Sequence, residues 1–432
     1  KSTGKFDLSD NSYLDYQVHR TADRHYLNTY NYGYNDTLSS HLRLRNLRNF
    51  NYYSFESYLF QDLRRDINQK SVPKILPRLK FDLNSDKKLN FLNFETRGEI
   101  INLKRTEGNE TKKFFINQNI LYPTLLADGT LINFGIHLNA GIYHIEKFDN
   151  PKKGRFEFSE FKSIFYPQMS IEITKPYIKT TKNYQTIIKP QFLYVKTNAN
   201  AFNRGIPDES NINNFYLDYF DLFNLNRLSG NDRADNISRF DYGLSFLKQS
   251  NLNQSSSKIG LGQSYQLDKH KYFPKNSGIN DRFSDILANI EVYPSEFLNI
   301  KSFISLSKDN FTIKNAYSTL MFNIKETYLG IQNINAPAVL DFDGANLIEA
   351  KNQFTLSFSQ HFSEFWSFTT SSTFDKKNKV KFHDINAKIK YEDECLGVSF
   401  NWKRQYTHNP ENPTSNSFLF LFSLKEIMEN DI

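Results

Sequence analysis

Apolar and polar residues alternate along most of this chain with a period of two. In residues 131–143, Ile, Phe, Leu or Ala occupies every even position, and Asn, Gly or His occupies the odd positions between them. The same alternation runs through residues 297–308, 354–368 and 382–391. Because successive side chains of a strand point to opposite faces, each run predicts a β-strand with one apolar and one polar face.

The expected strands are long, often about 10 to 14 residues, whereas strands of globular proteins usually have about 5 to 6. A tilted strand needs about 9 to 11 residues to cross a bilayer core. We count about 22 such segments, joined by turn-rich stretches such as "NSDKKLN" and "NPENPTSN". The pattern therefore predicts an all-β protein in which residues 1–432 form a large antiparallel transmembrane β-barrel. Neither a sandwich, with its shorter strands, nor a propeller, with its repeat, fits as well.

Composition strengthens this prediction. The mean hydropathy is −0.60, yet the chain contains 40 Phe and 25 Tyr. In a barrel only one face of each strand meets lipid, so the average stays polar while Phe covers the lipid band and Tyr occupies the interfaces. The sequence contains no run of 18 apolar residues, so it predicts no membrane-spanning helix.

The net charge of +7 is modest for 432 residues, and no concentrated basic stripe predicts a nucleic-acid partner. One basic cluster, "HLRLRNLRNF", places Arg43, Arg45 and Arg48 in a strand-like segment. It is either a solvated strand face or a face that meets an anionic ligand.

Catalytic and cofactor-binding motifs are missing from the sequence. HExxH, GxSxG, GxGxxG and the P-loop pattern do not occur, so we expect neither an enzyme nor a cofactor or metal site. His137 lies on the polar face of its predicted strand, where a hydrogen-bonded lumen side chain is expected. The single cysteine, Cys395, allows no internal disulfide.

One loop-like stretch contains the pattern N-R-x-S-G-x-D-R, formed by Asn226, Arg227, Ser229, Gly230, Asp232 and Arg233. A Pro-containing aromatic strand, "IIKPQFLYV", precedes it, and "KIGLGQSYQLD" follows as a G-Q-x-Y strand. Near the other end, "ECLGVSFNWKRQYTHN" and "NSFLFLFSLKEI" form a closing hairpin. In this order the motifs resemble those of the lipopolysaccharide-assembly outer-membrane proteins of the LptD family (Imp/OstA), and the resemblance covers nearly the whole chain.

The resemblance implies a barrel of about 26 strands with a periplasmic β-jelly-roll on its N-terminal side. Such a translocon inserts lipopolysaccharide into the outer leaflet of the outer membrane through a lateral gate. Its implied partners are lipopolysaccharide, the membrane, the lipoprotein plug LptE and the periplasmic bridge protein LptA. We expect this chain to be a C-terminal portion without the jelly-roll and the first strands. The alternatives are a general porin or ligand-gated receptor barrel for small solutes, and a soluble all-β binding protein.

Tracing hairpins back from the C-terminus places the N-R-x-S-G-x-D-R stretch on the extracellular side. We expect an Asp232–Arg233 pair, with Arg227 nearby, to pin a loop spanning about Thr197 to Arg233, with Gly230 allowing a positive φ. The alternative is that these arginines bind lipopolysaccharide phosphates.

The same tracing puts Cys395 at the periplasmic start of the penultimate strand. In the family this position carries paired cysteines that bridge to the N-terminal domain, whereas Leu396 follows here. The hypothesis is a disulfide to a cysteine in the missing N-terminal region, and the alternative is a free, half-buried thiol.

Overall fold

A computed structural model of the 432-residue chain shows the fold. It describes residues 1–24, 26–29, 37–64, 67–84, 91–146, 149–150, 154–155, 159–197, 206–207, 209, 217–228, 230–233, 235, 237–253, 255–268, 273, 277–340, 347–348, 350–375, 382–405 and 415–424.

Strands dominate the described residues, and 22 of them belong to one antiparallel sheet. This confirms the predicted all-β antiparallel class and the expected number of about 22 strands. Two further ladders of two short strands each, and two short helical turns, complete the described elements. Among the described residues, no helix has the length and hydropathy needed to cross a membrane.

The chain divides into two compact units. Unit 1 comprises Lys1–Ile173, Leu193–Ile212 and Leu228–Arg239, and unit 2 comprises Thr174–Phe192, Asn213–Arg227 and Phe240–Ile432. The first part of the chain contains β1 (Ser2–Ser9), β2 (Ser12–Val18), α1 (Tyr26–Thr29), β3 (Thr37–Arg48), β4 (Asn51–Asp62), η1 (Gln69–Ser71), β5 (Lys74–Asn84), β6 (Asn93–Lys104), β7 (Glu110–Leu125), β8 (Leu131–Glu146), β9 (Asp149–Asn150), β10 (Gly154–Arg155) and β11 (Ser159–Thr174).

The remainder of the chain contains β12 (Tyr177–Thr180), β13 (Tyr184–Thr197), β14 (Arg239–Ser250), β15 (Ser256–Gln266), β16 (Ile286–Ser295), β17 (Leu298–Leu306), β18 (Ile313–Ile324), β19 (Thr327–Ala336), β20 (Val339–Leu340), β21 (Leu347–Ile348), β22 (Lys351–His361), β23 (Trp366–Asp375), β24 (Phe382–Glu392), β25 (Leu396–Gln405) and β26 (Ser415–Leu424).

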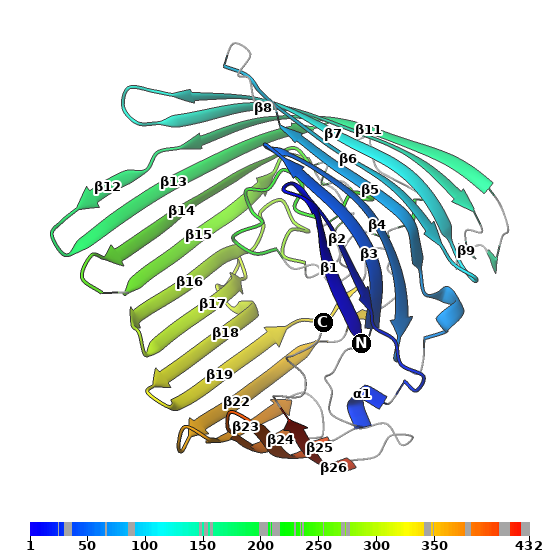
Figure 1. Cartoon of the computed structure of the whole chain (residues 1–432). Coiled ribbons are helices and arrows are strands. Elements are labelled where there is room, and N and C mark those ends of the chain that lie inside the picture. Colours follow the sequence, from blue (N-terminus) through cyan, green and yellow to red (C-terminus); the bar gives the residue numbers. More distant parts are fainter. Residues whose placement is uncertain are drawn as a thin grey trace. The chain divides into compact units, whose positions relative to one another are not determined.

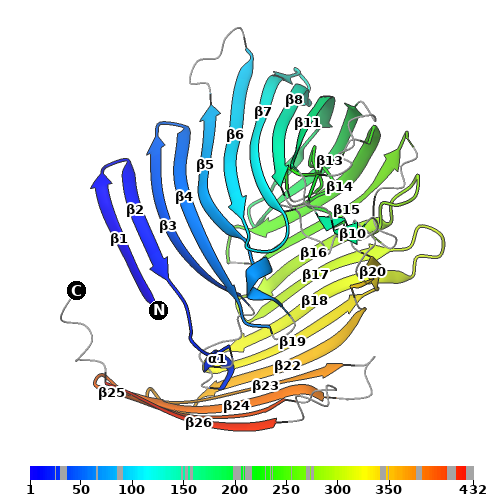
Figure 2. The same ribbon diagram turned by 90° about the vertical axis from the view of Figure 1, so that its right-hand side faces the viewer.

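Within each unit, strands that follow one another in sequence lie side by side. Figure 1 and Figure 2 both show β3 to β7 adjacent in chain order in unit 1, and β16 to β19 adjacent in unit 2. The β7–β8 hairpin is paired along its full length, from Glu110 opposite Glu146 to Leu125 opposite Leu131. Such hairpins satisfy the backbone hydrogen bonds between neighbouring strands, which a membrane-crossing sheet requires.

The two faces of the strands are reversed relative to a water-soluble protein. On β8, Phe134 and Ile136 are 43% and 41% exposed, whereas His137 and Asn139 are only 2% and 6% exposed. Apolar side chains therefore form the outward face and polar side chains the inward face, as the alternation predicts for strands in lipid. The expected hydrogen bonding of His137 is confirmed, because its ring nitrogens lie 2.8 Å from Asn119 Oδ1 and 2.9 Å from Ser170 Oγ.

The run at 354–368 is two strands, not one. β22 ends at His361 and β23 begins at Trp366, so a turn interrupts the alternation that appears continuous in the sequence. The Ser363 hydroxyl accepts hydrogen bonds from the backbone N–H groups of Phe365 and Trp366. This side chain stabilises the reversal locally, which period-two counting cannot detect.

The longest connections of the chain join strands at one end, and several very short turns join them at the other. Residues 49–50 and 126–130 link neighbouring strands in unit 1, and residues 296–297, 325–326 and 393–395 do so in unit 2. The connections at the opposite strand ends include residues 198–238, 267–285 and 337–350. Outer-membrane barrels have short periplasmic turns and longer extracellular loops. By this rule the long connections would lie at the extracellular end, which the tracing from the sequence also predicts.

Candidate functional site

The N-R-x-S-G-x-D-R motif lies in the connection between β13 and β14, residues 198–238, which we call the clamp loop. Ser229 lies outside the described residues. Of the other motif residues, Arg227, Gly230 and Asp232 are buried, and Asn226 and Arg233 are half-buried. Buried charged side chains are rare unless they are paired, so their partners define what holds this loop.

Arg227 is anchored to the inward face of β14 and β15 in unit 2. Its Nη1 donates a hydrogen bond of 3.1 Å to Ser264 Oγ and lies 3.9 Å from Asp241 Oδ1. The Ser264 hydroxyl in turn donates to Asp241 Oδ1 at 2.5 Å. The side chains of Arg227 and Asp241 are both fully buried. Each neutralises the other, because a buried charge without a counter-charge is energetically costly.

The segment just before the motif packs against two glycines of β15, which we call the glycine seat. Tyr219 and Leu222 are buried against β15, which carries Gly260 and Gly262 on its inward face. A Cβ atom at Gly260 would lie 2.5 Å from Tyr219 Cε1, and one at Gly262 would lie 2.5 Å from Leu222 Cδ2. These glycines of the "KIGLGQSYQLD" strand therefore permit close approach of the loop to the sheet.

Asp232 is anchored to the strands of unit 1. Its Oδ1 accepts a hydrogen bond of 2.9 Å from Lys113 Nζ, and its Oδ2 accepts one of 3.0 Å from the backbone N–H of Glu209. Lys113 Nζ also lies 3.1 Å from Glu99 Oε1. The Lys113 ammonium thus bridges a strand carboxylate and a loop carboxylate, all three side chains being less than one tenth exposed.

A second ion pair fastens an earlier part of the clamp loop in the same unit. Arg105 donates two hydrogen bonds, of 2.7 and 2.6 Å, to the carboxylate oxygens of Glu209. This bidentate geometry is the strongest form of the arginine–carboxylate pair. A cavity of about 240 Å³ lies beside these contacts and is lined by Arg78, Glu99, Lys113, Glu209 and Asp232 together with apolar side chains.

Apolar packing supports these ion pairs. Ile206 of the clamp loop belongs to a buried cluster in unit 1 with Phe115, Tyr143, Ile145, Ile164 and Tyr166. The loop backbone is also held: the Tyr143 hydroxyl donates to the carbonyl of Asn231, and Gln168 Nε2 donates to that of Asp235. The described parts of the loop are therefore packed against the inward face.

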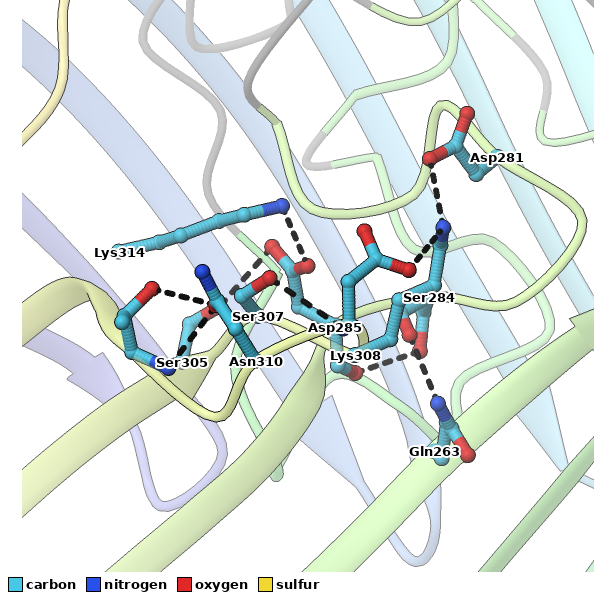
Figure 3. Close-up of polar contacts among 11 residues, drawn as sticks. Gln263, Asp281, Ser284, Asp285, Ser305, Ser307, Lys308, Asn310 and Lys314 are labelled. Atoms are coloured by element: carbon cyan, nitrogen blue, oxygen red, sulfur yellow. Dashed lines mark hydrogen bonds and ion pairs between the residues drawn. The ribbon is translucent and has the colours of Figure 1, made fainter.

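Another long connection in unit 2, residues 267–285, is fixed in a similar way. Figure 3 shows Lys314 reaching Asp285, whose Oδ1 lies 2.7 Å from the ammonium, and Lys308 reaching Asp281 at 3.2 Å. Ser305 Oγ donates to the other oxygen of Asp285 at 3.3 Å. Lys308, in the turn after β17, and Lys314, near the start of β18, thus hold this loop through its aspartates.

Cys395 is exposed in the turn between β24 and β25, immediately before the penultimate strand. This is the position expected from the sequence. Its backbone N–H donates to Asp393 Oδ1, as does that of Leu396, so the turn is fixed by an aspartate while the thiol stays accessible. Across the described residues, no group of three or more His, Cys, Asp or Glu is arranged to hold a metal ion.

The partners of the motif were not evident from the sequence. We expected Arg227 near an Asp232–Arg233 pair. In the structure, Arg227 forms its ion pair with Asp241, and Asp232 forms its ion pair with Lys113. The sequence could have indicated Asp241, because the alternation of residues 237–246 places it on the polar face of a predicted strand. Lys113 had no such signal, because it lies 119 residues from Asp232 and local periodicity contains no information on such pairings.

The chain has relatives among known proteins. It matches the family model described as LptD, LPS transport system D, over residues 1–366. The LPS-assembly protein LptD of Francisella tularensis subsp. novicida (strain U112) is 23% identical over 289 residues, which cover 58% of this chain and 32% of that protein. The aligned region thus spans about a third of that relative's length.

Among solved structures, the siderophore receptor PirA from Acinetobacter baumannii aligns with a TM-score of 0.40 and 7% identity. A mutant of the ferric enterobactin receptor PfeA from Pseudomonas aeruginosa aligns with a TM-score of 0.42 and 9% identity. Each alignment covers 98% of this chain and 72% or 71% of the receptor, respectively.

Proposed function

Because the chain belongs to the LptD family, we propose that it contributes the barrel of a translocon that inserts lipopolysaccharide into the outer leaflet of the outer membrane. Family membership confirms the predicted outer-membrane location and transmembrane β-barrel class. The observation that carries the proposal is the match over residues 1–366, which includes the complete clamp loop and its anchors.

The reversed faces of the strands support a divided path for an amphiphile. Inward side chains such as His137 and Asn139 are polar and can hydrogen-bond to sugar hydroxyls. Acyl chains do not suit such a face, because each CH₂ moved from an apolar into a polar environment costs about 0.8 kcal/mol. We infer that the sugar crosses the lumen while the lipid leaves through a lateral gate between the first and last strands of the full barrel.

This role is transport rather than catalysis, and it needs partners. The periplasmic bridge protein LptA would deliver lipopolysaccharide, and a lipoprotein plug, LptE, would occupy the lumen of the full-length protein. Both are inferred from the family and not from contacts of this chain.

Depletion of the full-length protein in cells tests the function. Loss of newly made lipopolysaccharide from the cell surface is expected, measured by labelling of surface sugars. Altered uptake of small solutes with normal surface lipopolysaccharide would instead support a porin or receptor barrel. Heat-modifiable migration in gels, typical of folded barrels, provides the control that the residual protein is assembled.

We also propose that the N-R-x-S-G-x-D-R motif is first a structural clamp. The buried ion pairs of Arg227 and Asp232 support this role, since each of these two charges is balanced by a residue of a strand. Asp232→Ala is expected to weaken barrel assembly and outer-membrane integrity. If Asp232→Ala and Arg233→Ala leave assembly intact but abolish crosslinking to lipopolysaccharide, the motif binds substrate instead.

A further inference from the structure

Charged side chains of alternating sign cross the inward face of β2 to β6 in unit 1. Asp15 on β2 accepts a hydrogen bond of 2.5 Å from Arg43 on β3. Arg78 on β5 lies 2.5 Å from Glu99 on β6 and 4.0 Å from Glu56 on β4. In this row every carboxylate has a basic neighbour, so Arg43, the first arginine of the "HLRLRNLRNF" cluster, is already neutralised.

The adjacent row, one step along the same face, carries basic side chains on β3 and β5. Arg45 on β3 pairs in register with Ser54 on β4, and Ser54 pairs with Lys80 on β5. Lys80 forms no ion pair within the part of the chain that the structure describes. The acid opposite it in register, Glu99, is already bound by two other cations. Two cations therefore flank one serine, and the acids nearest to them are held more closely by other basic groups.

The Nε of Arg45 faces one carboxylate oxygen, Asp15 Oδ1, at ion-pair distance but without a hydrogen bond. Its Nη1 donates to the Tyr13 hydroxyl at 3.0 Å, but its buried Nε has no hydrogen-bond partner and lies 3.9 Å from Asp15 Oδ1. The buried Ser54 hydroxyl also lacks a partner. Leaving buried donors unsatisfied is costly, and such atoms in native proteins usually belong to a site for water or a ligand.

The spacing of these groups suits a tetrahedral anion. In-register residues on β3 and β5 are roughly 10 Å apart, because two strand spacings separate them. The long Arg45 and Lys80 side chains can close this distance above the small Ser54. A guanidinium edge binds two oxygens of a phosphate, and an ammonium and a hydroxyl add donors from other directions. A planar carboxylate would use the guanidinium edge alone.

We propose that Arg45, Ser54 and Lys80 form a phosphate-binding site on the inward face, which takes a phosphate group of the phosphorylated sugar of the transported glycolipid. This inference rests on the proposed function and gives it a substrate contact. The site lies in the half of β3 and β5 nearest the short turn at residues 49–50, which is the periplasmic half by the assignment above. Sugar entering from the periplasm reaches it before the clamp loop.

Photocrosslinking in cells tests the site. A benzoylphenylalanine is placed at Tyr52, which shares the inward face of β4 with Ser54, in the full-length protein. In this background Lys80→Gln and Arg45→Gln are expected to lower the yield of crosslinked lipopolysaccharide by about tenfold, as loss of one charge-assisted hydrogen bond lowers a binding constant. Lys74→Gln, the same change at the exposed extracellular end of β5, should leave the yield unchanged.

Two controls separate the possible failures. Lipopolysaccharide lacking its sugar phosphates should crosslink weakly to every variant; equal crosslinking of both forms, or a phospholipid as the main product, overturns the proposal. An unchanged yield in Lys80→Gln and Arg45→Gln also overturns it and indicates that water fills the site. A second benzoylphenylalanine at Asn139 reports on the lumen in general: crosslinking there but not at Tyr52 rejects this site alone, whereas crosslinking at neither rejects the proposed function as well.

Discussion

At the scale of single residues, the clamp loop depends on buried charges that have one partner in the loop and one in a strand. Lys113 lies between Glu99 and Asp232, and all three side chains are buried. Removing one partner of a buried ion pair is more harmful than removing both partners, because the charge that remains is buried without its counter-charge.

We therefore predict that Lys113→Ala destabilises the refolded barrel by about 3 to 5 kcal/mol in urea titrations. The double variant Lys113→Met/Asp232→Leu should lose less, since no charge is stranded in the loop. The matched control is Lys112→Ala on the outward face of the same strand, whose exposed pair with Glu146 is worth about 1 kcal/mol or less. Equal effects of Lys113→Ala and Lys112→Ala would contradict the anchor.

A second prediction concerns the glycine seat. Gly260→Ala places a methyl group 2.5 Å from Tyr219 Cε1, so the buried ring has to move and the loop should lift from β15. Limited proteolysis of the folded barrel should then cut the clamp loop faster than in the wild type, with heat-modifiable migration retained.

Tyr219→Ala removes the side chain that the new methyl group meets. Adding Gly260→Ala to Tyr219→Ala should therefore not accelerate cleavage further. A Gly260→Ala variant that is cut at the wild-type rate would show that the loop does not need close approach at this glycine.

At the scale of elements, the outward face of β22 can be tested directly. Leu356 lies between Ile331 on β19 and Ser372 on β23 and is partly exposed on the apolar face. Leu356→Arg should cost about 2 to 4 kcal/mol near mid-bilayer. Leu356→Phe should have little effect, because lipid accepts both side chains.

Spin labels check the register of the same strand. A label at Leu356 should report lipid, and labels at Ser357 and Ser359 should report water. The reverse result would place every side chain of β22 on the wrong face, because a shift of one residue exchanges the two faces.

Periodicity was enough to predict strands, their faces and their number, because these depend on local alternation and on the solvent at each face. It missed the turn after His361, where Phe362 continues the apolar pattern although the chain has already reversed. It also missed the partners of Arg227 and Asp232. Those contacts join segments far apart in sequence, so they depend on strand register and loop path rather than on any local pattern.

At the scale of the whole molecule, Cys395 is a candidate for a disulfide to another part of the full-length protein. Its exposed thiol in the turn before β25 is accessible to a partner. We predict a disulfide to a cysteine of the N-terminal region, seen in non-reducing gels as a mobility shift that reduction removes. Cys395→Ser should abolish the shift. A full-length protein that migrates identically with and without reductant would instead have a free thiol.

The Lys113–Asp232 ion pair also constrains the order in which the molecule is assembled. Its two residues are 119 positions apart, and β8, β11 and β13 lie between them in the chain. Contacts of such separation require a long loop of chain to be closed, so they form after the local hairpins. The clamp is therefore a late event in barrel biogenesis. A barrel stalled before that stage would therefore leave the clamp loop unattached and open to proteolysis.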